Sequence, residues 1–281
     1  MQIKGLRYYY RKDGHAPEFV LDGIDLTINK GEYVAVIGAN GSGKSTLLKH
    51  FNGLLTPAEG NVWISGLNTR DYDNMRDIRG TVGMVFQEPD AQIVATVVEE
   101  DVAFGPENLG VPQDEIRRRV DWALDTVGMS ELKNRPSHLL SAGQKQLLVI
   151  ASALSMKTKC LVLDEAASML DPYARFKLMD TIARLHGKGM TVVTATHNMD
   201  EAALAQRIIV LSKGRISLEG PPGSIFTHDV DELKELKLAP PATVRIARRI
   251  AEQKSHFPED ILSVSGLVSE IARCYERSLN S

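Results

Sequence analysis

The segment 38–45, Gly-Ala-Asn-Gly-Ser-Gly-Lys-Ser, is the feature of this 281-residue chain that most constrains its fold. It fits the pattern G-x-x-x-x-G-K-[ST], whose glycines let backbone N–H groups surround phosphate oxygens. An apolar run at 33–37 precedes it, and residues 46–51 follow as a predicted helix. A strand, a glycine-rich turn and a helix in this order predict a nucleoside-triphosphate site at the helix N-terminus.

The residue types in this segment predict separate roles. Lys44 is expected to reach the β- and γ-phosphates of the nucleoside triphosphate, and the Ser45 hydroxyl to ligate Mg²⁺. The backbone N–H groups are expected to bind the phosphate oxygens. The residues expected to contact the nucleotide here are Gly38, Asn40, Gly41, Ser42, Gly43, Lys44, Ser45 and Thr46.

Strand and helix patterns alternate along the rest of the chain. Apolar runs predict strands at 3–10, 19–28, 33–37, 60–66, 82–86, 160–163 and 191–196, with a turn at 11–17. Amphipathic or well-capped stretches predict helices at 114–127, 147–154, 172–186, 242–254 and 267–275. Strand–helix–strand alternation around a phosphate loop predicts an α/β fold with a parallel sheet flanked by helices.

Composition and charge narrow the function classes. A net charge of −3 weighs against a nucleic-acid partner. Cys160 and Cys274 are too few and too far apart for a disulfide framework or a zinc site. No apolar run approaches the length of a membrane span, and the N-terminus lacks a secretory pattern. We therefore expect a cytoplasmic chain whose membrane role, if it has one, comes through a partner.

A second group of polar residues follows the apolar run 160–163. Asp164 is placed to hold Mg²⁺ at the edge of the sheet, and Glu165 to orient or deprotonate the attacking water. Two carboxylates at a strand end are by themselves more typical of a solvated strand terminus. Their combination with the phosphate loop favours ATP hydrolysis.

The segment 140–146, Leu-Ser-Ala-Gly-Gln-Lys-Gln, points to a particular family. Ser141 and Gln144 have capping-box spacing, so a well-capped helix is the simplest interpretation. The segment also closely resembles the Leu-Ser-Gly-Gly-Gln signature of ATP-binding-cassette (ABC) ATPases. The resemblance implies that Ser141, Gly143 and Gln144 face the γ-phosphate of ATP held by a second subunit. Ala142 replaces a glycine, which calls the efficiency of hydrolysis into question more than its existence.

The same resemblance assigns four further residues. Gln87 matches the Q-loop glutamine, a Mg²⁺ ligand, and Asp171 matches the D-loop while also fitting a helix N-cap before Pro172. His197 matches the switch histidine that contacts the γ-phosphate. Tyr10 matches the aromatic residue that stacks on adenine, although an ordinary strand tyrosine fits the pattern nearly as well.

The resemblance covers residues 1–228 and implies the architecture. It predicts a P-loop NTPase fold with a mainly parallel core sheet, an antiparallel N-terminal β-subdomain and a helical subdomain at about 90–157. Residues 229–281 are expected to form a small C-terminal helical extension.

Three segments resemble one branch of the family, the energy-coupling-factor (ECF) importers. They are Gln-Glu-Pro-Asp-Ala-Gln at 87–92, the run at 97–106, and 164–172. The resemblance implies a subunit at the cytoplasmic face of the cell membrane that energises uptake of vitamins or transition-metal ions. It also implies three kinds of partner: a second ATPase subunit, identical or paralogous, a transmembrane coupling protein and small membrane substrate-binding proteins.

Two alternatives stay open at this point. One is the ATPase subunit of a conventional ABC importer or exporter, which pairs with a large permease. The other is a soluble ABC ATPase of DNA repair or translation. Such proteins usually carry long coiled coils, zinc motifs or tandem cassettes, and the sequence has none of these.

Overall fold

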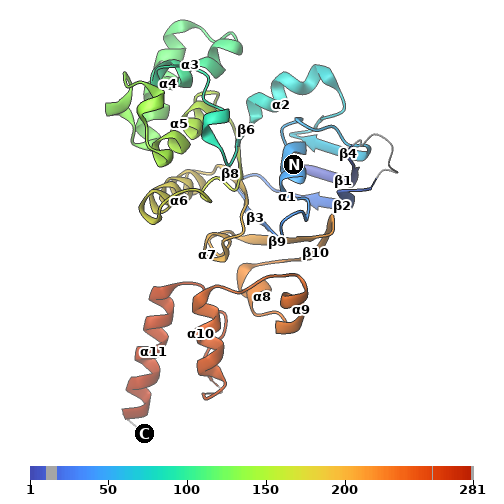
Figure 1. The fold of residues 1–281 in the computed structure, drawn as a ribbon, viewed down its shortest axis with the longest axis vertical. Helices are drawn as coiled ribbons and strands as arrows, with labels where there is room; N and C mark the ends of the chain where they lie inside the picture. The colour runs from blue at the N-terminus through green and yellow to red at the C-terminus, as the bar shows by residue number, and fades with distance from the viewer. Residues whose placement is uncertain (11–17, 255, 280–281) are drawn as a thin grey trace.

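The computed structural model of the chain describes residues 1–10, 18–254 and 256–279. The turn predicted at 11–17 lies outside the described residues. The chain forms two β-sheets with helices packed around them, so the predicted α/β class is confirmed (Figure 1).

The larger sheet has six strands in the order β10-β9-β3-β8-β7-β6. Their bounds are β3 Tyr33–Ile37, β6 Val82–Val85, β7 Cys160–Asp164, β8 Thr191–Ala195, β9 Arg207–Ser212 and β10 Arg215–Gly220. All neighbours are parallel except the β9–β10 pair. Every residue of β3, β7 and β8 is buried, because helices or the second sheet cover both faces.

The smaller sheet is antiparallel, in the order β2-β1-β4-β5, as predicted for the N-terminal part. Its strands are β1 Gln2–Tyr8, β2 Leu21–Thr27, β4 Glu59–Ile64 and β5 Leu67–Asn68. The strand predicted at 3–10 ends at Tyr8, because the ladder with β2 ends at the pair Tyr8–Leu21. Tyr10 therefore lies beyond the sheet.

The core sheet separates two hydrophobic cores. One core lies between the two sheets and encloses α1 (Lys44–His50). The other joins the opposite face of the sheet to the helices α3 Val98–Asn108, α4 Gln113–Val127, α5 Ala142–Ser155 and α6 Pro172–Gly187. In Figure 1, α3, α4 and α5 gather at one end of the molecule, beyond α6. The remaining elements of this part are α2 Met75–Thr81, α7 Met199–Ala202 and short 3-10 helices at Tyr72–Asn74, Pro89–Ala91, Ser130–Leu132 and Ser137–Leu139.

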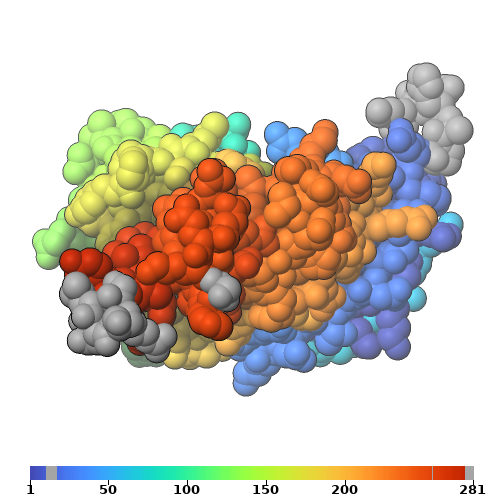
Figure 2. Space-filling view, turned by 90° about the horizontal axis from the view of Figure 1, so that it is seen from below, coloured from blue at the N-terminus to red at the C-terminus, as the bar shows by residue number. Residues whose placement is uncertain are grey.

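The C-terminal part is helical, as predicted for the residues after 228. Its helices are α9 Val230–Glu235, α10 Ala242–Ala251 and α11 Val264–Leu279, and α8 Pro222–Phe226 precedes them. Ala247, Phe257, Ile261 and Leu267 form a small core of their own. In Figure 1, α10 and α11 project away from the sheets, and in Figure 2 the orange and red C-terminal residues occupy the middle of the face seen from below. Within the described residues, no helix is long and apolar enough to cross a membrane.

Candidate nucleotide-binding site

The phosphate loop connects the carboxyl end of β3 to α1, as the pattern predicts. A Cβ on Gly38 would lie 2.1 Å from the carbonyl oxygen of Leu211, and one on Gly43 would lie 2.9 Å from that of Val20. Both glycines also have φ in the left-handed region. No side chain caps α1, and its first turn carries no acidic residue. The start of α1 is therefore left available to an anion.

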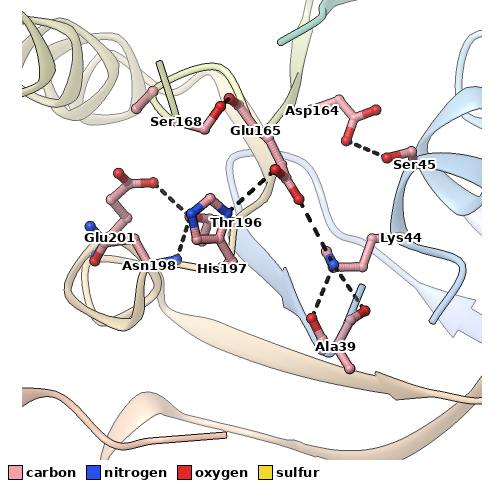
Figure 3. A network of polar contacts seen from close by, with 12 residues as sticks. Ala39, Lys44, Ser45, Asp164, Glu165, Ser168, Thr196, His197, Asn198 and Glu201 are labelled. Atoms are coloured by element: carbon pink, nitrogen blue, oxygen red, sulfur yellow. Dashed lines mark hydrogen bonds and ion pairs between the residues drawn. The ribbon is translucent and has the colours of Figure 1, made fainter. Parts of the chain in front are cut away.

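Lys44 is held inside this loop. Its side chain is 5% exposed, and Nζ donates to the carbonyl oxygens of Gly38 at 3.0 Å and Ala39 at 3.3 Å. The same Nζ lies 3.9 Å from Oε1 of Glu165 (Figure 3). A buried ammonium that touches loop carbonyls and one carboxylate is placed to receive a phosphate group.

Ser45 and Asp164 meet at the start of α1. The Ser45 hydroxyl donates to Oδ1 of Asp164 at 2.8 Å. Burial raises the pKa of Asp164, and the hydrogen bond from Ser45 only partly offsets this effect. A buried carboxylate beside a hydroxyl fits a Mg²⁺ that keeps several waters and is shared with phosphates. Among the described residues, no group of three His, Cys, Asp or Glu side chains is arranged to hold a metal ion.

An Asp164→Asn chain is expected to be more stable than the wild type without nucleotide, but unable to hydrolyse ATP. Because the folded pKa of Asp164 is raised, the free energy of unfolding falls as pH rises through the window between the unfolded and folded pKa values. Asparagine removes that cost, so the melting temperature near pH 7.5 should rise by about 2–4 °C. The gain in melting temperature should shrink at lower pH. Asp125→Asn, at an exposed position of α4, should give no gain at either pH. Equal melting temperatures of the wild type and the Asp164→Asn chain, at pH 7.5 as well as at lower pH, would contradict this account.

Glu165 lies between Lys44 and His197. Its Oε1 faces Nζ of Lys44, and its Oε2 lies 3.3 Å from Nδ1 of His197 (Figure 3). Its φ of 51° is in the left-handed region, a conformation that costs about 1–3 kcal/mol in a non-glycine residue. The backbone N–H donates to Ala195 O at 3.0 Å, which fixes this conformation at the end of β7. The structure thus brings together the three residues predicted to be catalytic.

The order of the strands in the sheet explains why these three residues lie close together. Lys44, Glu165 and His197 follow β3, β7 and β8, three neighbouring parallel strands. Their loops leave the same edge of the sheet, where ligands bind in open α/β folds. The His197 side chain is 58% exposed, so it remains accessible from solvent.

Tyr10 lies beside the phosphate loop. Its hydroxyl is 3.2 Å from Oγ1 of Thr46, and its ring packs edge-on against Tyr8 with centroids 5.1 Å apart. The residue is 44% exposed, which leaves ring surface free for a base. These contacts suit the predicted stacking role.

A Tyr10→Ala chain is expected to bind ATP roughly tenfold more weakly, because base–aromatic stacking contributes about 1–3 kcal/mol. Titration calorimetry with ATP and with inorganic triphosphate separates stacking from phosphate contacts. Only ATP binding should weaken. Tyr9→Ala is the matched control, since the Tyr9 ring packs against Phe19 instead. An equal loss for both ligands would contradict stacking.

Gln87 follows β6 and is exposed. Within the described part of the chain it makes no hydrogen bond or ion pair, so its side chain is free to turn toward a ligand. Gln92 and Gln146, to which the sequence analysis assigned no role, hold this loop. Gln92 accepts from Phe86 N at 2.7 Å and donates to Met84 O at 2.9 Å, while Gln146 donates to Phe86 O at 3.0 Å.

The predicted capping box at the start of α5 is present. Gln144 N donates to the Ser141 hydroxyl at 3.3 Å, and Ser141 N donates to Gln144 Oε1 at 3.0 Å. Gly143 packs so closely on α6 that an added Cβ would lie 2.7 Å from Ala174 Cβ. Ala142 is exposed, so its methyl group disturbs no packing within its own chain.

Asp171 caps α6, as predicted, by accepting from the N–H groups of Tyr173 and Ala174. Ser141, Gly143, Gln144 and Asp171 line one hollow of about 430 Å³. No residue of the phosphate loop 38–45 lines that hollow. Between the described residues, no hydrogen bond or ion pair joins the two groups. The predicted site residues therefore form two separate sets, the loop set around Lys44 and the signature set around Ser141.

Residues 21–168 match the family model described as ABC transporter. The chain belongs to the ABC transporter family. It is an ABC-type ATPase. The matched range runs from β2 to just beyond Glu165.

Curated relatives place it within the family. The energy-coupling factor transporter ATP-binding protein EcfA1 of Symbiobacterium thermophilum is 49% identical over 98% of this chain and 97% of its own length. The protein of the same name from Caldanaerobacter subterraneus subsp. tengcongensis is 48% identical over 90% of this chain and 92% of its length. The resemblance to ECF transporter ATPases is thereby confirmed.

Solved structures support the same fold. CbiO1 from Clostridium perfringens, part of the ABC transporter complex cbiONQ, superposes with a TM-score of 0.74 at 35% identity, covering 90% of this chain and 95% of CbiO1. The ATP-binding cassette MJ0796, solved as a dimer in a post-hydrolysis state with ADP and Pi, has a TM-score of 0.71 at 29% identity, covering 79% of this chain and 98% of its own.

Proposed function

We propose that this ABC ATPase hydrolyses ATP to energise an ECF-type importer of vitamins or transition-metal ions. The observation that carries the proposal is similarity to ECF ATP-binding proteins over nearly the whole chain, including the region after residue 228. In this proposal residues 1–228 are the ATPase domain, with its helical subdomain at about 90–157. Residues 229–281 form the C-terminal extension.

The loop set is proposed to bind ATP and hydrolyse it. Lys44 and the backbone N–H groups of 38–45 hold the β- and γ-phosphates, and Ser45, Asp164 and Gln87 hold Mg²⁺. A bound Mg²⁺ neutralises phosphate charge and helps fix the γ-phosphate for attack. Glu165 accepts a proton from the attacking water, while His197 orients Glu165 and faces the γ-phosphate. Catalysis then rests on positioning and on charge stabilisation.

The signature set is proposed to complete the site of a second ATPase subunit. Ser141, Gly143 and Gln144 begin α5, and its N-terminus would face the γ-phosphate held by the partner's loop. The separation of the two sets within one chain supports this arrangement. Two ATP molecules would then lie between two subunits, and closing and opening of the pair would drive the membrane partner. The second subunit is either the same chain or a paralogue.

A groove between α2, α3 and α5 is proposed to receive the transmembrane coupling protein. It has a volume of about 800 Å³, and its lining includes Tyr72, Met75, Phe104, Leu109 and Met156. Tyr72 is 87% exposed and Phe104 48%, so apolar surface is offered to a partner. Gln92 lies in the same groove and holds the loop of Gln87, which gives a docked helix a direct route to the site. The chain is thus proposed to act at the cytoplasmic face of the membrane, together with small substrate-binding membrane proteins.

Uptake assays test this function. In a strain whose chromosomal copy carries Glu165→Gln, uptake of radiolabelled vitamins or of Co²⁺ or Ni²⁺ should fall to background, while a Glu235→Gln strain should match the wild type. The ECF assignment would be contradicted if the Glu165→Gln strain lost the export of a compound instead of an uptake activity. Unchanged uptake of every vitamin and metal tested would also contradict it.

A further inference from the structure

Glu201 is a buried carboxylate close to the switch histidine. It lies on α7 with only 8% of its surface exposed. Its Oε2 accepts from the Thr196 hydroxyl at 2.7 Å, and that hydroxyl oxygen accepts from Asn198 N at 3.0 Å. Asn198 in turn caps α7 through the N–H groups of Asp200 and Glu201. The residues on both sides of His197 are therefore fixed by Glu201 (Figure 3).

Arg175 links Glu201 to a second loop. Its Nε lies 3.4 Å from Oε1 of Glu201 and also 3.4 Å from the carbonyl oxygen of Ala167. Arg175 is in the first turn of α6, the helix that Asp171 caps. The guanidinium of Arg175 thus contacts both Glu201, which holds the neighbours of His197, and the segment 167–171.

The segment 167–171 is hydrogen-bonded to Glu165. Ser168 donates to the Glu165 carbonyl oxygen twice, from its backbone N–H at 3.0 Å and from its hydroxyl at 2.8 Å. A closed path therefore runs from Glu165 to Ser168 and its chain neighbour Ala167, and from there through Arg175 to Glu201. It continues from Glu201 to Thr196, the chain neighbour of His197, and returns across the 3.3 Å contact of His197 with Glu165.

Burying a carboxylate costs free energy unless the group is paired and hydrogen-bonded. The buried position of Glu201 therefore calls for an explanation. Within the described chain, the carboxylate of Glu201 is hydrogen-bonded to Thr196 and paired with Arg175, and no hydrogen bond or ion pair joins it to the phosphate loop 38–45. We infer that Glu201 is a positioning residue that, together with Arg175, holds His197 against Glu165 and ties it to the segment 167–171. This inference rests on the role proposed above for His197.

Glu201→Gln separates positioning from folding. Glutamine keeps an oxygen for the Thr196 hydroxyl but loses the charge that pairs with Arg175. We expect kcat for ATP hydrolysis to fall roughly tenfold, with KM for ATP and the melting temperature nearly unchanged, because only the alignment of the reacting groups is lost. Arg175→Met, which removes the other partner from a more exposed position, should give a similar loss. Asp231→Asn, which breaks the exposed pair of Asp231 with Lys234, is the matched control and should have no effect.

The same substitutions in a His197→Ala background test whether Glu201 acts through His197. If Glu201 acts through His197, Glu201→Gln should cause no further loss of kcat there, measured in single turnovers. Losses that multiply would overturn the inference, as would an unchanged kcat in both the Glu201→Gln and Arg175→Met chains. Wild-type hydrolysis by His197→Ala alone would instead refute the role proposed for His197. If Glu201→Gln does not fold, Arg175→Met carries the same comparison.

Discussion

A Glu165→Gln chain is expected to bind ATP with wild-type affinity and to hydrolyse it at least about 100-fold more slowly, because a general base contributes roughly 10²–10⁴-fold. Glutamine keeps the size of the side chain and its oxygen contact with His197, but it cannot accept a proton from water. In the proposed arrangement each ATP lies between the loop set of one subunit and the signature set of the other, so ATP held without hydrolysis should keep the two subunits together.

Two measurements check this result. Release of phosphate gives the rate, and light scattering with ATP and Mg²⁺ gives the mass of the complex. Wild-type ATPase should dissociate as ATP is consumed, whereas Glu165→Gln should stay paired. Glu235→Gln changes an exposed glutamate on α9 in the same way and should behave as wild type. Hydrolysis by Glu165→Gln at the wild-type rate would show that another group is the base.

A Lys44→Ala chain is expected to lose at least about 100-fold in ATP affinity, and with it all hydrolysis. Removing a buried charge from a charge pair costs roughly 2–5 kcal/mol, and the phosphates supply the opposite charge here. Among the described residues, the polar partners of Nζ in the protein without nucleotide are two carbonyl oxygens and the more distant Glu165 carboxylate. The loss should therefore appear mainly in binding and little in folding.

Calorimetric titration with ATP measures the affinity of the Lys44→Ala chain, and its melting temperature checks that it folds. Lys4→Ala, in the exposed part of β1, serves as the control and should bind ATP normally. Tight ATP binding by the Lys44→Ala chain would mean that the loop 38–45 is not the phosphate site.

The parts predicted best from the sequence are those encoded in one contiguous stretch. Gly38, Gly43 and Lys44 lie within eight residues. The two glycines have the positive φ that glycine adopts without strain, and the Lys44 side chain is buried in the loop. The fully buried strands β3, β7 and β8 also read directly from their apolar runs. The meeting of Lys44 with Glu165 and His197 follows once those strands are neighbours.

Contacts between distant segments were out of reach of sequence reasoning. The Arg175–Glu201 pair joins two residues that are 26 positions apart and lie on different helices, and nothing local marks either residue as a partner of the other. The close packing of Gly143 on Ala174 is equally invisible before α5 and α6 are placed. β9 and β10 are different, because the apolar run of β9 and the alternation of polar and apolar residues in β10 are sequence signals that the strand prediction did not use.

Purification of this chain with its partners tests the central claim most directly. The chain is tagged in its native cell, membranes are solubilised in mild detergent, and the co-purifying proteins are identified by mass spectrometry. The account predicts a transmembrane coupling protein, one or more small membrane substrate-binding proteins, and a second ATPase subunit that is either this chain or a paralogue. Recovery of a large conventional permease, or of ribosomes or DNA, in place of these membrane proteins would contradict it.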